Sequence, residues 1–386
     1  MDKNERNGLL PRASGILAHP TSLPGPHGIG DLGAGAYAFL DFLVKGAQRV
    51  WQILPLGQPG LGNSPYSALS AFAGNALLVS LERLLDEGLL SERDLAGGPR
   101  FSADNVDYEV VTPYKLAMLR RAYERFARAA PPAMREEFSA FRTKESGWLG
   151  DYALFMALKA VNHGVTWNEF GPALARREPD ALVQAHRDLA DDITFHEFVL
   201  YQFFRQWTAL RRYANGRGIR IMGDIPIFVA YDSADVWANQ DLFYLDENGD
   251  PTVVAGVPPD AFSATGQRWG NPLYRWDELA RTGYKWWIER FRQTLATVDF
   301  MRVDHFRGFQ AYWEVPAEAE TAEHGRWVDG PGEDLFRVVG KELGQLPIVI
   351  EDLGLITEDV IALRKKLGYP GMKVLQFAFG DDERNP

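Results

Sequence analysis

The segment Phe300–Gly308, FMRVDHFRG, joins an apolar strand-like run to four charged or titratable side chains. Residues i and i+2 of a strand share a face, so Arg302 and Asp304 point to one side while Met301 and Val303 point toward the helices. Buried charge without a partner costs several kcal/mol, so the cluster needs a structural or a chemical reason. We expect a functional site here, with a buried Arg302–Asp304 salt bridge as the structural alternative.

Short apolar runs of this kind alternate with helical stretches along the chain. Strands are predicted at 14–18, 49–54, 219–225, 299–304, 347–351 and 372–377, and the stretch from about 71 to 216 is mostly helical. Apolar strands that alternate with helices predict an α/β fold with a parallel sheet. A closed βα barrel needs eight strands, whereas an open doubly wound sheet accepts these six, so the pattern leaves both open.

The composition of the chain argues against several classes of protein. The chain has 386 residues, 46% of them hydrophobic, and a net charge of −11. That charge argues against a nucleic-acid or anionic-membrane surface. The absence of Cys excludes disulfides and thiolate chemistry, and no run reaches the ~20 apolar residues of a membrane span. We expect a soluble cytoplasmic protein, in which the 11 Trp offer flat faces for stacking sugars.

Several predicted strands end in polar side chains. They are His19 after the first strand, Asp224 after the third, Asp304 with His305 after the fourth, and Glu351 with Asp352 after the fifth. Active sites of parallel α/β folds lie at these carboxyl ends. A single acidic residue at a strand end usually has a structural role. We predict a functional site here because several strands end in acidic residues, together with a His and an Arg.

Two of these carboxylates have different surroundings. The neighbouring guanidinium of Arg302 is expected to keep Asp304 ionised, which suits a nucleophile. Glu351 follows the apolar run PIVI, which is expected to raise its pKa and suits a general acid. Such a pair fits retaining glycosyl transfer, in which one carboxylate attacks the anomeric carbon and the other protonates the leaving oxygen.

Two further motifs predict no ligand. GIGDLG at 28–33 matches a dinucleotide-binding pattern but follows a Pro-rich loop and lacks an acid about 20 residues on. DENGD at 246–250 lacks the ligand spacing of a calcium loop and predicts a hairpin turn. The His residues show no metal spacing, and we expect no metal and no cofactor.

Six blocks along the chain together resemble one family. They are HPTSLPGPHGIGDLG from His19, WQILPLGQPGLGNSPYSALSAFAGN from Trp51, GDIPIFV from Gly223, AGVPPDAFSATGQRWGNPLYRW from Ala255, RVDHFRG with VIEDLG 47 residues on, and PGMKVLQFAF from Pro370. Their order and content resemble the amylomaltases, the 4-α-glucanotransferases of the α-amylase superfamily. The resemblance implies a (β/α)8 TIM barrel, of which about six of eight strands are present.

The resemblance also implies a role for particular residues. Asp304 would be the nucleophile, Glu351 the general acid/base, and Arg302 the group that orients Asp304. Sugar would be bound by His305 and Asp224, by Tyr66 as a stacking platform, and by Asp260, Phe262, Gln267 and Trp269 on a mobile loop. The structural alternatives are loop packing for Tyr66 and Phe262, a core plug for Trp269, and a strand-end cap for Asp224.

The resemblance further implies an organisation and a set of partners. Residues 1–70 would be the first part of the barrel, 71–214 a helical insertion, and 215–386 the remainder with the substrate loop at 255–276. A third catalytic Asp and two strands would follow Pro386, so we expect a C-terminally truncated chain that is poorly soluble and inactive alone. Substrates would be maltooligosaccharides, amylose or glycogen-like α-glucans. An α-glucan hydrolase and a non-catalytic glucan-binding protein remain as alternatives.

Overall fold

The computed structural model describes residues 12–260, 263–354 and 356–379, and these residues form two compact units. Unit 1 comprises the described part of Met1–Met222 with Val229–Gln240 and Glu247–Asp250. Unit 2 comprises Gly223–Phe228, Asp241–Asp246 and the described part of Pro251–Pro386. The predicted three-part division of the chain stays a prediction.

A parallel sheet is the central element that the sequence predicted. Its strand order is β1-β2-β3-β6-β9. The strands are β1 (Gly15–Leu17), β2 (Val50–Gln52), β3 (Arg220–Ile225), β6 (Phe300–Val303) and β9 (Ile348–Ile350). In unit 1 Trp51 pairs with Ile16 on one side and Ile221 on the other, and in unit 2 Arg302 pairs with Val349. Five of the six predicted strands are therefore confirmed, each within two residues at either end.

The sixth prediction, a strand at 372–377, is wrong. Leu375–Phe379 form a short 3-10 helix, η7. The main-chain N–H of Met372 donates to Asp352 Oδ1 at 2.8 Å, and Leu375 and Phe379 are exposed. An apolar run becomes a strand only when a neighbouring strand takes up its main-chain groups, and in the described part of the chain none pairs with this segment.

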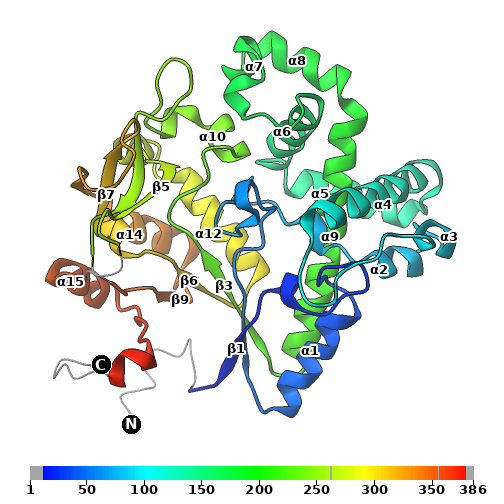
Figure 1. Ribbon diagram of the computed structural model, residues 1–386, viewed down its shortest axis with the longest axis horizontal. Coiled ribbons are helices and arrows are strands. Elements are labelled where there is room, and N and C mark those ends of the chain that lie inside the picture. Colours follow the sequence, from blue (N-terminus) through cyan, green and yellow to red (C-terminus); the bar gives the residue numbers. More distant parts are fainter. Residues whose placement is uncertain (1–11, 261–262, 355, 380–386) are drawn as a thin grey trace. The chain divides into compact units, whose positions relative to one another are not determined.

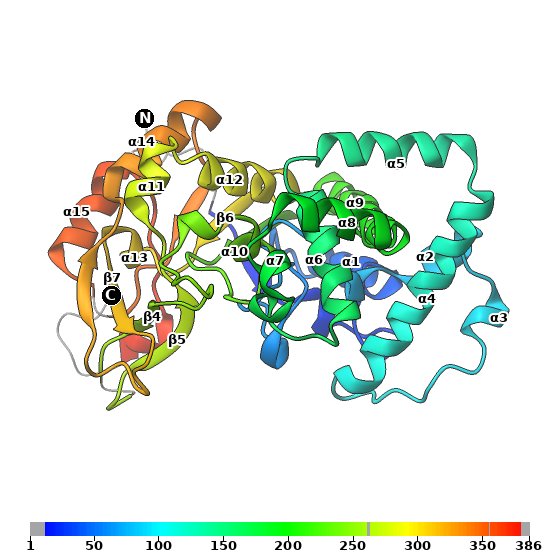
Figure 2. The same ribbon diagram turned by 90° about the horizontal axis from the view of Figure 1, so that it is seen from above.

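The helices of unit 1 confirm the predicted helical stretch (Figures 1 and 2). They are α1 (Ala34–Lys45), α2 (Leu81–Asp86), α3 (Glu92–Leu95), α4 (Tyr108–Ala129), α5 (Pro132–Lys144), α6 (Leu149–Val161), α7 (Pro172–Ala175), α8 (Pro179–Asp188), α9 (Ala190–Gly216) and α10 (Ala234–Ala238). Long α9 contacts α1, α4, α5, α6 and α8. None of the described helices is long and apolar enough to cross a bilayer.

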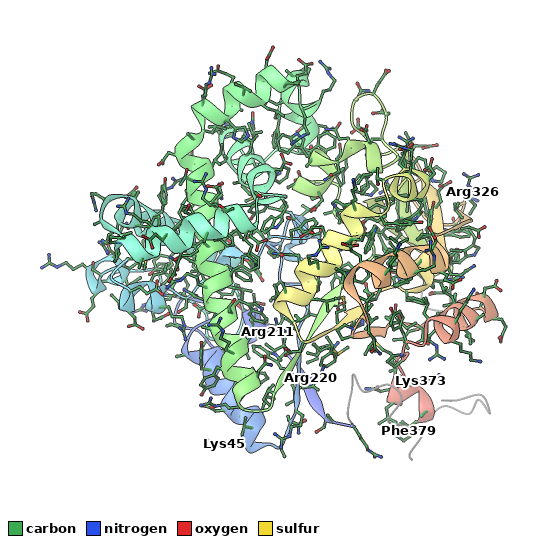
Figure 3. All side chains as sticks on the ribbon, turned by 180° about the vertical axis from the view of Figure 1, so that it is seen from behind. Lys45, Arg211, Arg220, Arg326, Lys373 and Phe379 are labelled. Carbon is green, nitrogen blue, oxygen red and sulfur yellow. The ribbon has the colours of Figure 1, made fainter. Side chains whose placement is uncertain are left out.

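Unit 2 carries a second sheet that the sequence analysis missed. It is antiparallel, with the order β5-β4-β7-β8. Its strands are β4 (Val253–Val257), β5 (Gln267–Pro272), β7 (Ala311–Pro316) and β8 (Arg326–Asp329), and Arg326 extends from its outer strand β8 (Figure 3). The predicted substrate loop at 255–276 is thus largely the β4–β5 hairpin. The predicted turn at 246–250 is confirmed by an antiparallel bridge between Leu245 and Pro251.

Unit 2 also contains the helices α11 (Trp276–Arg281), α12 (Lys285–Thr297), α13 (Arg307–Gln310), α14 (Gly332–Leu343) and α15 (Glu358–Leu367). Of these, α12 contacts the parallel strand β6, and α13 contacts the antiparallel strand β7. Met301 and Val303 are fully buried, while Arg302 and Asp304 are half-buried. The alternation predicted for β6 is therefore confirmed, and it directs the charged side chains away from the helix-covered face.

Candidate active site

Arg302 on β6 joins two carboxylates at the carboxyl ends of the strands. Its Nη1 donates to Asp224 Oδ1 at 2.9 Å and Oδ2 at 2.8 Å, and its Nη2 lies 2.5 Å from Asp304 Oδ1. The Asp224 side chain is 1% exposed, whereas that of Asp304 is 25% exposed. The charges of Arg302, Asp224 and Asp304 are thus paired with one another. Of the two carboxylates, only that of Asp304 retains substantial access to solvent.

The neighbouring strand β9 ends at the second predicted catalytic carboxylate, Glu351. The main-chain N–H of Glu351 donates to Val303 O at 3.0 Å, which sets it beside the end of β6. Its Oε2 accepts from the N–H of His305 at 2.9 Å, and its Oε1 from the N–H of Leu353 at 2.7 Å. Both carboxylate oxygens therefore receive main-chain donors from the two strand ends.

Burial raises the pKa of the Glu351 carboxyl, and the negative charge of Asp304 acts in the same direction. The N–H groups of Leu353 and His305 and the charge of Arg302 oppose this rise without cancelling it. The raised pKa predicted from the apolar run PIVI is confirmed. Glu351 consequently stays protonated to a higher pH than an ordinary glutamate, as a general acid must.

His305 presents a neutral imidazole beside these carboxylates. Burial, with a smaller contribution from the Arg307 charge, lowers the pKa of His305 to about 4. Its buried Nε2 has no hydrogen-bond partner among the described residues. The ring lies edge-on to Trp269, with 4.8 Å between centroids and an angle of 79° between the planes. An unpaired buried nitrogen is suited to bind a ligand hydroxyl.

Trp269 projects from β5 and is 39% exposed, so the structure excludes the core-plug alternative. Its Nε1 donates to Gln267 Oε1 at 3.2 Å, and its ring lies 6.5 Å from that of Phe228. The Trp269 side chain thus contacts both Gln267 and His305. Both residues belong to strand β5 of the predicted loop, and the mobility of that loop stays a prediction.

The remaining predicted sugar-binding residues lie in other segments of the chain. Asp260 follows β4, and its Oδ1 accepts from the N–H of Ser263 at 2.8 Å. Phe262 lies outside the described residues. Tyr66 belongs to unit 1, follows a short 3-10 turn at Leu61–Asn63 and is 37% exposed. Their sugar-binding roles stay predictions.

One buried group near the site was missed by the sequence analysis. Arg290 of α12 is 3% exposed, and its Nη1 donates to Ile227 O at 3.1 Å. Tyr274 Oη donates to the same carbonyl at 3.1 Å. These bonds hold the segment that follows Asp224. A basic residue among the tryptophans of YKWWIERF was the available signal, since a cation in an apolar helix must have a buried partner.

The described residues contain no group of three or more His, Asp or Glu side chains that could hold a metal ion. The side chains of the site itself offer several reactive and binding groups. The site has a paired, partly exposed carboxylate, a carboxyl with a raised pKa on the adjacent strand, a neutral imidazole and an exposed indole. A polar ligand with apolar faces would suit such a surface.

Comparisons with known proteins identify close relatives. Residues 18–386 match the model of the family described as 4-alpha-glucanotransferase. The 4-alpha-glucanotransferase of Thermus thermophilus is 53% identical over 98% of this chain and 75% of its own length. That of Synechocystis is 51% identical over 97% of this chain and 75% of its own.

A solved structure supports the same likeness. The amylomaltase of Streptococcus agalactiae, determined in complex with acarbose, superimposes with a TM-score of 0.92. It is 41% identical and is matched over 96% of this chain and 75% of its own length. The predicted fold class, the TIM barrel of the α-amylase superfamily, is therefore confirmed, with five parallel strands in the described residues.

Proposed function

This chain belongs to the 4-alpha-glucanotransferase family, and from that premise we propose that it transfers α-1,4-glucan segments by double displacement on Asp304 and Glu351. The observation that carries this proposal is the contrast between the two carboxylates. Asp304 is paired with Arg302, whereas burial raises the pKa of Glu351. One group is thus suited to attack and the other to donate a proton.

In the first step, Asp304 attacks the anomeric carbon of the donor and the glycosidic C–O bond breaks. Glu351 transfers its proton to the leaving oxygen, so the departing glucan leaves as an alcohol. In the second step, ionised Glu351 takes the proton from the 4-hydroxyl of the acceptor. That oxygen attacks the anomeric carbon and releases Asp304, and two inversions give net retention.

The sugar-binding part of the proposal rests on the groups around these carboxylates. His305 Nε2 would bind a sugar hydroxyl, and the exposed Trp269 ring would cover an apolar sugar face. Maltooligosaccharides, amylose and glycogen-like glucans have both kinds of group. Asp224, Tyr66, Asp260, Phe262 and Gln267 are proposed to complete the substrate contacts, and a cytoplasmic location is part of the same proposal.

The test is chromatography of the products from maltotriose, with the full-length product of the gene as the enzyme. We expect glucose and a ladder of longer maltodextrins, both absent in Asp304→Asn. Asp334→Asn, the same change in an ion-paired aspartate on α14, is the matched control and should keep the ladder. Glucose and maltose without longer products would favour the hydrolase alternative, and glucan binding without products would favour the non-catalytic one.

A further inference from the structure

The main chain of His305 has an unusual conformation. Its φ is +47°, in the left-handed region, and the following Phe306 is right-handed with φ −54° and ψ −30°. Alternation of the two hands turns successive N–H groups to the same side of the chain. Here the N–H of His305 donates to Glu351 Oε2 at 2.9 Å, and that of Phe306 to Glu351 O at 3.2 Å. Two adjacent donors thus converge on one residue.

Contacts of the imidazole hold this conformation. One is the edge-on contact with Trp269. The ring also lies over Gly308, where an added Cβ would lie 2.9 Å from Ile227 Cδ1, 3.0 Å from His305 Cδ2 and 3.6 Å from His305 Nε2. A hydrogen bond of 2.9 Å from the Gly308 N–H to His305 O closes the turn. Any side chain at position 308 would therefore press on both the Ile227 side chain and the imidazole ring.

The groups that face the Glu351 carboxyl can be named. Asp304 and Arg302 act on it through their charges, and the N–H groups of His305 and Leu353 bond to its oxygens. The adjacent Asp352 instead accepts from Met372 and pairs with Arg364. The Arg307 guanidinium stacks on Trp327, 3.8 Å from the ring centroid. His305 is neutral near pH 7 because its pKa is lowered to about 4.

We propose that His305 is a positioning residue for Glu351, acting through its main chain: Trp269 and Gly308 hold the imidazole, and the resulting left-handed turn aims the His305 N–H at Glu351 Oε2. This inference rests on the proposed function, since it assigns Glu351 the acid/base role. It gives His305 a second task beside sugar binding. It also links the β5 strand that carries Trp269 to the proton donor of the reaction.

The consequence can be measured as a pH profile. A hydrogen-bond donor stabilises the ionised carboxylate, so its loss moves the acid form of Glu351 to higher pH. The basic limb of kcat/KM, which reports the acid of the free enzyme, should then move upward by roughly one pH unit. A purely structural role of His305 would lower activity without moving this limb.

Three variants and a control separate the main-chain role from the side-chain role. His305→Asn removes the imidazole but retains a residue that tolerates the left-handed region, so its limb should shift less than that of His305→Val. His305→Val introduces a β-branched residue that does not, and Gly308→Ala displaces the imidazole. Both should show the upward shift. His163→Val makes the same change at an exposed His with φ +56° and should leave the limb in place.

The pH profiles of these variants distinguish a positioning role of the His305 main chain from a purely structural role. Equal limbs in His305→Asn and His305→Val, whether both shifted or both unshifted, would overturn the inference. If His305→Val does not fold, an unshifted Gly308→Ala would overturn it. If the wild-type gene product transfers no glucan, the proposed function fails instead. A carbon-13 NMR titration of Glu351 in the wild type and in Gly308→Ala then still tests the positioning, because it needs no turnover.

Discussion

Asp224→Asn tests whether Asp224 acts on the reaction through Arg302. Both oxygens of Asp224 accept from Arg302 Nη1, and only 1% of the side chain is exposed. The substitution keeps the shape of the side chain but turns one acceptor into an amide donor that faces the guanidinium. Arg302 then keeps its ion pair with Asp304 and loses one of the two oxygens of residue 224 that accept its hydrogen bonds.

The expected size follows from these contacts. A hydrogen bond to a charged group contributes about 1.5–3 kcal/mol, and the Asn retains one of the two acceptors. The Arg302 side chain is 14% exposed, so water replaces the lost acceptor poorly. A loss of about 2–3 kcal/mol in the transition state corresponds to a decrease in kcat/KM of roughly 30- to 150-fold. The free energy of unfolding should fall by about 1–3 kcal/mol.

Initial rates of glucose release from maltotriose give kcat and KM separately. A positioning role places the loss in kcat, and a double-mutant cycle with Arg302→Lys should be strongly non-additive because the two residues share one contact. Asp235→Asn, the same change in a buried aspartate of α10, is the control and should affect stability without lowering kcat. An unchanged kcat with a raised KM, or additive effects in the cycle, would refute the positioning role and leave Asp224 only its proposed contact with the sugar.

Three further results are expected. Because its pKa is raised, the acid form of Glu351 is lost as pH rises through that pKa, so kcat/KM of the wild type should fall on the basic side. Glu351→Gln should lower transfer by about 10²- to 10⁴-fold and remove this limb from the rate profile. The same raised pKa means that the folding stability of the wild type declines as pH rises above the ordinary glutamate value, and Glu351→Gln should lack this decline in urea unfolding; a decline of equal size in both proteins would contradict this. Lys115→Met should cost about 3–5 kcal/mol in urea unfolding, because fully buried Lys115 bonds Asp31 at 3.1 Å and the carboxylate would lose its partner; a cost below about 1 kcal/mol would contradict that account.

The sequence predicted best where local pattern and chemistry agree. The alternation in β6 placed Arg302 and Asp304 on one face, and the apolar run before Glu351 anticipated its raised pKa. These features depend on residues within a few positions of one another, so the sequence displays them directly. The ion pair between Arg302 and Asp224 spans 78 residues, and only the parallel strand order brings it together.

The features that sequence reasoning missed depend on long-range pairing. Strands β4 and β5 contain Gly, Asn and Pro, which are unfavourable in strands, and they form because Val254 pairs with Val315 and Pro272. The apolar segment at 372–377 has the opposite property, since its composition favours a strand but no described strand pairs with it. The left-handed conformation of His305 could not be predicted either, because it depends on contacts with Glu351, Trp269 and Gly308.

The central claim is that Asp304 forms a covalent bond to the glycosyl group. The direct measurement is mass spectrometry of the full-length gene product after reaction with a fluorinated α-glucosyl fluoride, whose fluorine substituent slows the second step. We predict the mass increase of one fluoroglucosyl group, located by proteolysis on the peptide that contains Asp304 and absent in Asp304→Asn. A label on another carboxylate, or turnover of the reagent without any adduct in both the wild type and Glu351→Gln, would contradict the account.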